Sequence, residues 1–404
     1  MPRLGARILL LGGDADHNVG DCAILTALSH CIVAHDASAG IAIVGDPTVH
    51  SAIPGVAQVI PGGLRGIAEL TRAACKADRI LVAGGGLFQD DDSRAKMPYW
   101  AARISLLKAC NGHIAGFSIG AGPLTHVESR AAARMACAAL TRISVRDRFA
   151  RDALAACTSR PIGIVPDPAF MLEPAPRDAA TAFLKRLDLP AERPLLFVAV
   201  RRWFHERGGF VPNGLKAGLG IEPKRDPARF EAMQSAVAEA VKVVAHRLDA
   251  NILLLPTYNV AREGDDFACE ALMWRMPGVT ARLARIADPR LYKAVLGHAS
   301  LVIAARMHPL ILAAGMGVPF VGLSYNPKFD GLYDLLGLSS RSLPLDHCPE
   351  IWGASTLVAA AESVLDARID LRHRAESIAS TVRLQTLEAV FGSAAGRVLE
   401  TADA

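Results

Sequence analysis

The chain has 404 residues, more than one ordinary hydrophobic core contains, so its length predicts two domains. Apolar residues make up 51% and charged residues 21%, which excludes an intrinsically disordered chain. A net charge of +4 is small for this length. It excludes a dedicated nucleic-acid binder, which would carry clustered basic stripes.

The eight cysteines are widely spaced and form no CxxC pair, which argues against a disulfide framework and a cysteine-rich metal site. Free thiols in a reducing compartment, with no signal-peptide pattern, predict a cytoplasmic protein. The longest apolar stretch, residues 309–325, is interrupted by Gly315, Gly317 and Pro319. No membrane-spanning segment is therefore expected.

Short apolar runs alternate with helical patterns through the first half of the chain. Strands are expected at Arg7–Leu11, Gly40–Val44, Arg79–Ala83, His113–Ile119, Arg142–Val145 and Gly163–Val165. Helices are expected at Asp21–Ala34, Leu64–Ala77, Pro98–Ala109 and Glu128–Leu140. Continuously apolar strands that alternate with helices are typical of a parallel sheet covered on both faces.

A polar stretch rich in proline and alanine, residues 173–193, predicts a domain junction. We therefore expect an N-terminal domain over 1–175, a C-terminal domain over 190–350, and helices in 351–404 that pack back on the domains. Strands are expected in the second domain at Leu195–Val200, Asn251–Leu255, Leu301–Ala304 and Phe320–Leu323, and helices at Pro227–Leu248, Pro289–His298 and Pro309–Gly315. The predicted fold class is α/β, with two Rossmann-like domains facing a central cleft. Ligands bind such folds beyond the carboxyl ends of the strands.

The loop after the first expected strand reads GGDADHNVGD over residues 12–21. Its glycines let backbone N–H groups approach a ligand, and the helix that follows offers an N-terminal anion site. The spacing is not GxGxxG, however, and three aspartates would repel a pyrophosphate. Asp14, Asp16 and Asp21 suit hydroxyl binding or general-base chemistry better. The structural alternative is a loop capped by Asn18 or Asp21.

Two more glycine-bearing loops follow apolar strands, AGGGLFQD at 83–90 and SIGAGP at 118–123. Consecutive glycines indicate a close approach of the backbone to a ligand or a tight turn.

Arginines follow other strands, in SVRDR at 144–148 and VRRW at 200–203. They are expected to face the cleft; a surface salt bridge with Asp147 is the alternative for the first. The second motif leads into a long glycine-rich loop through Arg225, of a length typical of functional or mobile loops.

The most informative pattern is ARMHP at 305–309, followed by SYNPKF at 324–329. Pro309 is expected as the first helical residue, which places His308 at a helix N-terminus. Arg306, His308 and Lys328 follow adjacent strands and are expected to converge. Three such groups together are costly unless an anion neutralises them, so the pattern predicts an anion site. A capping or core role is the alternative for His308.

These loops together resemble the polysaccharide pyruvyl transferase family. The resemblance covers about residues 7–340 and rests on GDADHNVGD, AGGGLFQD, GFSIGAGP, SVRD, VPDPAF and, most specifically, ARMHPLILAAGMGVPFVGLSYNPKF. It implies the GT-B-like two-domain architecture. It also implies transfer of pyruvate from phosphoenolpyruvate onto two hydroxyls of one sugar, which forms a cyclic ketal and releases phosphate. The implied partner is a polysaccharide or lipid-linked saccharide acceptor, with phosphoenolpyruvate as donor substrate and neither cofactor nor metal.

The family chemistry suggests a role for each singled-out residue. His308 is expected as the general acid that protonates C3 of the donor, with Asp14 and Asp21 as further catalytic residues. The donor is expected to contact Arg146, Arg201, Arg306, His308 and Lys328. Arg148 is an alternative to Arg146. The expected acceptor-binding residues are Asp16, Asn18, Gly85, Gly86 and Asp90.

Two other functions fit the same architecture. One is a nucleotide-sugar glycosyltransferase, and the other is an inactive homologue that acts as a subunit of a polysaccharide assembly complex. A lipid-linked acceptor would bring the protein to the inner face of the membrane as a peripheral protein, and a homo-oligomer is compatible with the sequence.

Overall fold

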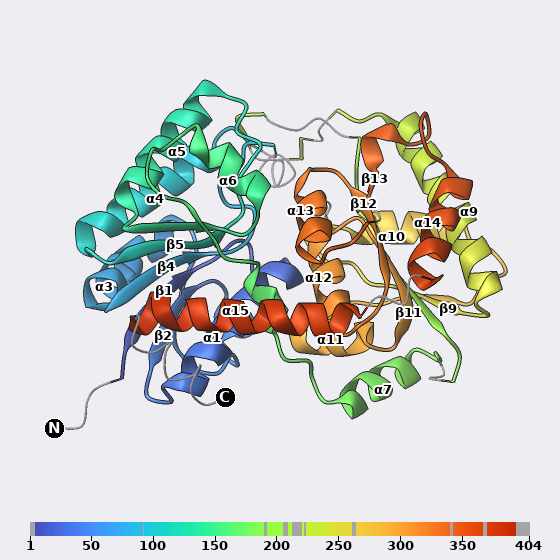
Figure 1. Ribbon diagram of the computed structural model, residues 1–404, viewed down its shortest axis with the longest axis horizontal. Coiled ribbons are helices and arrows are strands. Elements are labelled where there is room, and N and C mark those ends of the chain that lie inside the picture. The colour runs from blue at the N-terminus through green and yellow to red at the C-terminus, as the bar shows by residue number, and fades with distance from the viewer. Residues whose placement is uncertain are drawn as a thin grey trace.

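The computed structural model describes residues 5–91, 93–189, 192–204, 209–211, 220–221, 224–260, 264–339, 342–366 and 370–392. Much of the predicted glycine-rich loop after Trp203 lies outside these residues. The described chain forms two parallel β-sheets, each covered by helices, in two lobes that lie side by side (Figure 1). We call them the first and second domains.

The first domain contains a seven-stranded sheet in the order β3-β2-β1-β4-β5-β6-β7, with every pair parallel. Its strands are β1 (Arg7–Leu11), β2 (Gly40–Val44), β3 (Val56–Ile60), β4 (Arg79–Ala83), β5 (Ile114–Ile119), β6 (Arg142–Val145) and β7 (Gly163–Ile164). Its helices are α1 (Val19–His35), α2 (Pro47–His50), η1 (Leu64–Gly66), α3 (Ile67–Lys76), α4 (Lys96–Cys110), α5 (Val127–Ala139), α6 (Arg148–Ala155) and η2 (Pro168–Met171).

The second domain contains a six-stranded parallel sheet in the order β10-β9-β8-β11-β12-β13. Its strands are β8 (Leu195–Ala199), β9 (Asn251–Leu254), β10 (Ala281–Leu283), β11 (Ala299–Ala304), β12 (Phe320–Ser324) and β13 (Leu343–Pro344). Its helices are α7 (Arg177–Arg186), α9 (Pro227–Arg247), α10 (Asp266–Trp274), α11 (Pro289–Leu296), α12 (Met307–Gly315), α13 (Lys328–Leu335), η3 (Leu345–His347) and α14 (Ala354–Asp366).

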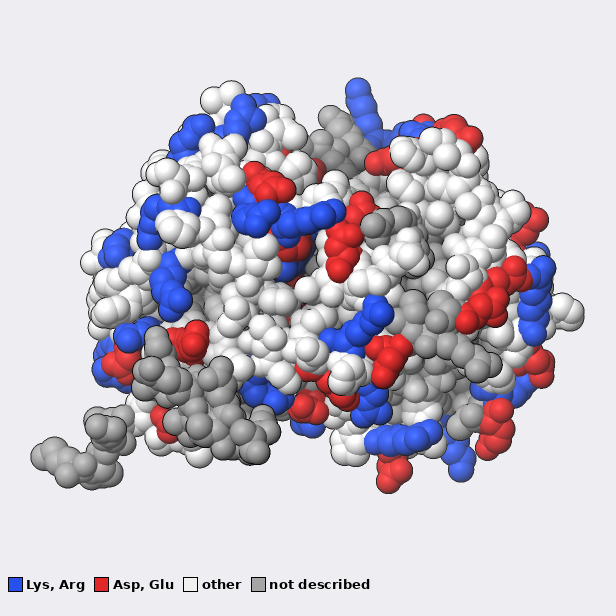
Figure 2. Space-filling view, in the orientation of Figure 1, with Lys and Arg blue, Asp and Glu red and all other residues white. Residues whose placement is uncertain are grey.

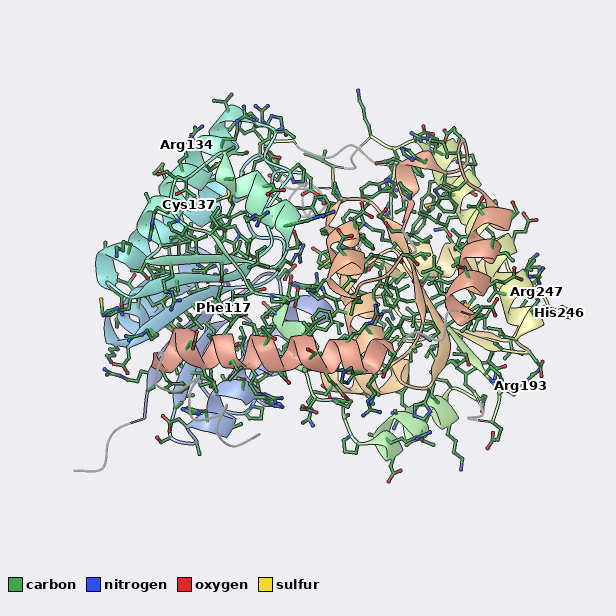
Figure 3. All side chains as sticks on the ribbon, in the orientation of Figure 1. Phe117, Arg134, Cys137, Arg193, His246 and Arg247 are labelled. Atoms are coloured by element: carbon green, nitrogen blue, oxygen red, sulfur yellow. The ribbon has the colours of Figure 1, made fainter. Side chains whose placement is uncertain are left out.

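The central strands are buried on both faces because helices cover both sides of each sheet. All five residues of β8 are buried, as are the last four of β1. Continuous burial explains why these strands read as uninterrupted apolar runs, since neither face meets water. Figure 3 shows side chains filling each interior, whereas Arg193, His246 and Arg247 lie at the outer edge of the second domain.

Each sheet reverses its strand order at one point, between β1 and β4 in the first domain and between β8 and β11 in the second. In open α/β sheets such a reversal leaves a crevice beyond the carboxyl ends of the two strands, where ligands bind. The loops after β1, β4, β8 and β11 carry most of the residues singled out from the sequence. The topology therefore directs attention to the space between the domains.

The contacts that join the domains include a long helix and a backbone bridge. The helix α15 (Leu371–Phe391) runs across both, packing against α1 and η2 on one side and α12 on the other (Figure 1). The backbone of Asn18 forms an antiparallel bridge with that of Tyr258, and the Val19 N–H donates to the Thr257 carbonyl at 3.0 Å. The loop after β1 is thus fixed directly to the loop after β9.

The exterior carries Lys and Arg side chains interspersed with Asp and Glu on the face seen in Figure 2. Among the described helices, none is both long enough and apolar enough to cross a membrane.

Candidate active site

A buried aspartate lies between the domains, flanked by an arginine from one and a histidine from the other. Asp167 follows β7, and its Oδ2 is 3.6 Å from Nη1 of Arg146 and 3.6 Å from Nε2 of His308. All three side chains are buried. Within the described part of the chain, neither Nε2 of His308 nor Oδ2 of Asp167 has a hydrogen-bond partner. Buried polar atoms in this state are candidates for ligand contact.

The charge of Asp167 is maintained by its neighbours. Burial disfavours the carboxylate, but His308 and Arg146 outweigh that penalty and hold the pKa of Asp167 below its usual value. Its Oδ1 accepts a hydrogen bond from the Ala169 N–H at 3.0 Å, which caps η2. Arg146 in turn lies over a glycine, since a Cβ at Gly120 would be 3.0 Å from the arginine Cζ.

His308 lies against the start of α1. A Cβ at Gly20 would be 2.0 Å from the imidazole Nδ1, so only glycine permits this approach. Asp21, the next residue, is buried, and its Oδ2 accepts a hydrogen bond from the Asp14 N–H at 3.1 Å. Burial raises the pKa of Asp21, although the charge of His308 opposes the change. Asp21 and His308 therefore form one electrostatic unit across the domain interface.

Three cationic side chains, Lys328, Arg201 and Arg306, act on the phenol of Tyr325. Arg201 lies over its ring at 4.0 Å from Cζ to the centroid, and Nζ of Lys328 is 4.4 Å from the same centroid. Burial opposes ionisation of Tyr325, but the charges of Lys328, Arg201 and Arg306 prevail and lower the pKa to about 7. Burial, with the nearby charge of Arg146, lowers the pKa of Lys328. We call Arg146, Arg201, Arg306 and Lys328 the cation cluster.

We expected Arg306 to carry a positive charge without a counter-charge, but it has a buried acidic partner. Its Nε and Nη2 donate to the carboxylate of Asp265 at 3.0 and 2.7 Å. Asp265 is buried and also accepts the N–H groups of Thr257 and Tyr258 at 3.3 and 3.1 Å. Arg306 therefore needs no bound anion to balance its charge, because Asp265 already supplies the opposite charge.

The structure distinguishes the two arginines of the SVRDR motif. Arg146 is buried in the site, where its Nε also lies 3.3 Å from Asp147. Arg148 has a side chain that is 57% exposed and forms an ion pair of 2.6 Å with Asp334 of α13. Of the two, only Arg146 lies beside Asp167.

The other polar residues of the loop after β1 form hydrogen bonds that stabilise this loop and its neighbours. Asn18 is the N-cap of α1, with its side chain accepting from the Gly20 N–H at 2.9 Å. Oδ1 of Asp14 is 2.8 Å from Nδ1 of the exposed His17. Oδ1 of Asp16 lies 2.6 Å from Nε2 of His50 and accepts the Asp46 N–H at 2.8 Å. These contacts tie Asp16 to the loop after β2.

The triple-glycine loop after β4 packs tightly against side chains of the protein. Gly85 has a φ of +62°, and a Cβ there would be 2.7 Å from the Asp21 carboxylate. A Cβ at Gly86 would be 2.5 Å from the Gln89 side chain. Asp90 is 1% exposed, and its carboxylate accepts the N–H groups of Thr125 and His126 at 2.8 and 2.9 Å. Asp90 thus holds the loop before α5.

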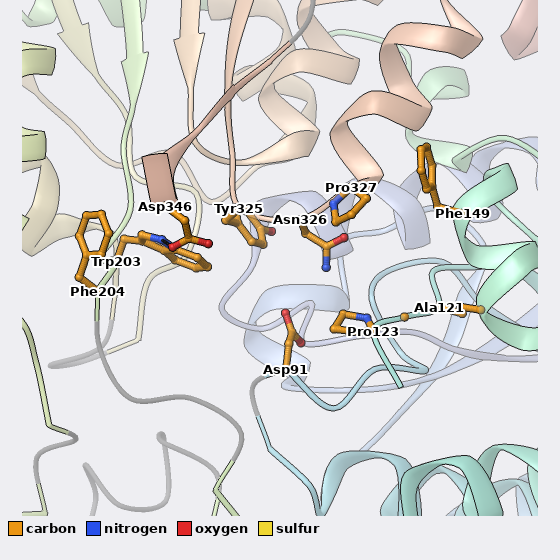
Figure 4. Close-up of a pocket in the computed structure, with 12 residues that line it drawn as sticks. Asp91, Ala121, Pro123, Phe149, Trp203, Phe204, Tyr325, Asn326, Pro327 and Asp346 are labelled. Atoms are coloured by element: carbon orange, nitrogen blue, oxygen red, sulfur yellow. Dashed lines mark hydrogen bonds between the residues drawn. The ribbon is translucent and has the colours of Figure 1, made fainter. Parts of the chain in front are cut away.

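A pocket of about 490 Å³ lies beside the cation cluster, between the domains (Figure 4). Its apolar walls are formed by Trp203, Phe204, Tyr325, Pro327, Phe149 and Pro123, and its polar lining includes Asp91, Asn326 and Asp346. Tyr325 is shared, because it lines this pocket and also contacts the cations. Within the described residues, no cluster of His, Cys, Asp and Glu is arranged to hold a metal ion.

Sequence reasoning missed four of these residues: Asp91, Asp167, Asp265 and Tyr325. Asp167 and Tyr325 stand in the VPDPAF and SYNPKF motifs, so the motifs contained the signal. Asp91 directly follows the predicted Asp90. Asp265 follows β9 by more than ten residues, and no local pattern distinguishes it from a surface acid.

Comparison with solved structures identifies the architecture. S. aureus MnaA in complex with UDP matches with a TM-score of 0.57 at 10% identity, covering 95% of each chain. The UDP-GlcNAc 2-epimerase of Methanocaldococcus jannaschii matches with 0.56 at 11% identity, covering 94% of this chain and 99% of that one. A glycosyltransferase of Rickettsia africae matches with 0.52 at 10% identity, covering 98% and 97%. At these identities the likeness shows the fold alone, the GT-B fold of two facing α/β domains.

The family is shown by a different comparison. No curated protein matches the chain. A family model described as polysaccharide pyruvyl transferase matches residues 18–327, most of both domains. The match includes Asp21, Arg146, Asp167, Arg306 and His308, and it ends one residue before Lys328. The chain therefore belongs to the polysaccharide pyruvyl transferase family.

Proposed function

We propose that the protein transfers the pyruvyl group of phosphoenolpyruvate to two hydroxyls of a saccharide, which forms a cyclic ketal. The observation that carries the proposal is the buried group Arg146–Asp167–His308, assembled from both domains beside the cation cluster. It places a buried arginine and a buried carboxylate beside a histidine whose Nε2 has no hydrogen-bond partner among the described residues. The expected acceptor is a polysaccharide or its lipid-linked precursor.

The donor carries a carboxylate and a phosphate, and the cation cluster suits both. Arg146 and Arg201 offer planar guanidinium groups that can hold either anion by paired hydrogen bonds, and Lys328 adds a point charge. Arg306 is already held by Asp265, so its contribution to the donor is its electrostatic field. A bound dianion would also offset the mutual repulsion of cations gathered around Tyr325.

The chemistry requires a proton at C3 of the enol before C2 can accept an oxygen. His308 supplies that proton, and Asp167 stabilises the charged imidazole until it does so. One sugar hydroxyl adds to C2, the bond from C2 to the phosphate oxygen breaks, and the second hydroxyl closes the ring. The two hydroxyl protons balance the reaction, since one replaces the proton given to C3 and the other leaves with hydrogen phosphate.

Asp21 is the carboxylate best placed to return a proton to the site. It is buried beside His308, and its raised pKa brings its protonation closer to neutral pH. Asp14 is exposed and paired with His17, and it acts on the reaction through its N–H donation to Asp21.

Thermal unfolding with phosphoenolpyruvate, with UDP and with buffer alone tests the donor. A ligand at a hundred times its dissociation constant stabilises the folded state by about 2.7 kcal/mol. We expect phosphoenolpyruvate to do so. Stabilisation by UDP alone would favour a nucleotide-sugar glycosyltransferase instead. Incubation with phosphoenolpyruvate and a sugar panel should then yield phosphate and a product heavier by one pyruvyl ketal.

A further inference from the structure

The pocket beside the cation cluster is chemically unlike the cluster itself. Its described lining contains two carboxylates, Asp91 and Asp346, and neither lysine nor arginine. That lining offers an anionic donor no cationic partner, whereas a neutral polyol could donate its hydroxyl protons to both acids. Its volume of about 490 Å³ is within the range of pockets that hold small molecules.

The aromatic wall of the pocket is fixed before any ligand arrives. The Trp203 Nε1–H donates to Oδ1 of Asp346 at 2.7 Å, and the Trp203 and Tyr325 rings lie 5.3 Å apart. Arg201 lies over both rings, at 5.0 and 4.0 Å. Aromatic faces pack well against the apolar C–H face of a pyranose ring, while the hydroxyls at its edge need polar partners. A rigid wall lowers the entropic cost of binding.

The next residue shows that the local backbone is strained. Phe204, which also lines the pocket, has a φ of +57°, a conformation that a bulky side chain rarely adopts. Strained residues of this kind cluster at ligand sites, where surrounding contacts hold them in place. The strain is therefore a second observation, independent of the lining, that favours a binding role.

Asp91 connects the pocket to the reaction centre. Its carboxylate lines the pocket, and its charge acts on the Lys328 ammonium of the cation cluster. Figure 4 shows Asp91 extending from the first domain toward Tyr325 and Asn326 of the second. A hydroxyl bound by Asp91 would lie next to a donor held by Lys328.

We propose that this pocket is the acceptor subsite, in which a hexose ring packs against Trp203 and Tyr325 while Asp91 accepts a hydrogen bond from a sugar hydroxyl. That the bound sugar is the acceptor of the reaction rests on the proposed function. That the pocket binds a saccharide does not. The proposed acceptor-binding carboxylate is therefore Asp91 and not the expected Asp90, whose oxygens accept hydrogen bonds from the loop before α5.

The test uses two pocket variants and a control on the same helix. Ala153→Phe places a ring into the pocket from α6, and Asp91→Asn removes one charge at nearly constant shape. Ala155→Phe is the control, because Ala155 is exposed on α6 and does not line the pocket. Binding of methyl glycosides of glucose, galactose, mannose and their N-acetylamino derivatives is measured by saturation-transfer NMR. Binding of phosphoenolpyruvate is measured separately by calorimetry.

We expect the wild type and Ala155→Phe to bind at least one glycoside equally. Ala153→Phe should abolish that binding, and Asp91→Asn should weaken it about tenfold, the value of one charged hydrogen bond. Phosphoenolpyruvate should bind Ala153→Phe as it binds the wild type, and Asp91→Asn at least as tightly, since a negative charge near Lys328 is gone.

Two results would overturn the subsite: no glycoside bound by the wild type, or undiminished binding by Asp91→Asn and by folded Ala153→Phe. If glycosides bind as expected but phosphoenolpyruvate does not bind the wild type, the saccharide site stands and the proposed donor falls.

Discussion

Nε2 of His308, on the first turn of α12, lies 3.6 Å from Oδ2 of Asp167, which follows β7 in the other domain. The imidazole and the carboxylate beside it thus come from different domains. Their separation depends on how the domains meet, and α15 and the bridge between Asn18 and Tyr258 fix that arrangement. The geometry of the site therefore depends on the interface between the two domains.

Replacement of His308 by glutamine should separate donor binding from chemistry. The amide keeps polar contact near Asp167 but cannot deliver a proton to C3, so phosphate release should fall about 10²- to 10⁴-fold. Affinity for phosphoenolpyruvate, measured by calorimetry, should change little. His113→Gln is the control, because His113 is exposed directly before β5, and this variant should keep full activity. Wild-type turnover by His308→Gln would exclude this histidine as the acid.

Arg146 and Arg148 offer a direct comparison within one motif. Arg146→Ala removes a buried guanidinium beside Asp167 and should weaken phosphoenolpyruvate binding about 100-fold. Arg148→Ala removes an exposed interdomain ion pair with Asp334, which should lower stability by less than about 1 kcal/mol and leave donor affinity unchanged. Calorimetry on both variants decides the matter, and equal affinities would remove Arg146 from the donor site.

The regular core could be predicted from the sequence because its strands are buried on both faces. The expected strands Arg7–Leu11, Gly40–Val44, Arg79–Ala83 and Arg142–Val145 coincide with β1, β2, β4 and β6. The edge strand β3 was missed, since its exposed positions break the apolar run. The helix α12 begins at Met307 and not, as expected, at Pro309. Proline is tolerated there because the first-turn N–H groups of a helix have no partner within it.

The site could be predicted only as a set of strand-end loops. Arg146, Arg201 and His308 do come together with Lys328 at the interface, as their positions after parallel strands indicated. Their partners could not be found in this way, because Asp265 reaches Arg306 from a loop more than ten residues past β9. The neighbours Asp90 and Asp91 show a second limit: loop geometry turns one carboxylate into the first domain and leaves the other lining the pocket.

The pairing of Arg306 with Asp265 predicts a structural cost for a substitution at this arginine. Arg306→Gln leaves a buried carboxylate without its counter-charge, which should lower the free energy of unfolding by about 3–5 kcal/mol in urea titrations. The double variant Arg306→Gln with Asp265→Asn should recover most of that loss. Arg285→Gln breaks the more exposed pair with Asp266 and serves as the matched control, with a change below about 1 kcal/mol. If Arg306→Gln instead kept full stability and lost donor binding, Arg306 would be a direct donor ligand.

Tyr325 should titrate near neutral pH, unlike an ordinary tyrosine. Its pKa is lowered to about 7 in the folded protein, against about 10 in an unfolded chain. Between these values the unfolded state binds more protons, so the contribution of Tyr325 to the free energy of unfolding rises with pH from about 7 to 10 and is lost as pH falls below 7. An ultraviolet difference titration should show one phenolate forming near pH 7 in the wild type and in the Tyr99→Phe control, but not in Tyr325→Phe.

The same titration reports on the donor. A bound phosphoenolpyruvate would place negative charge beside the cations that stabilise the phenolate, so the pKa of Tyr325 should rise when the donor is saturating. The Tyr99→Phe variant should show the same rise, because Tyr99 is exposed on α4 and contacts no member of the cation cluster in the described part of the chain. A titration that stays unchanged while calorimetry shows the donor bound would mean that phosphoenolpyruvate occupies a place away from Tyr325.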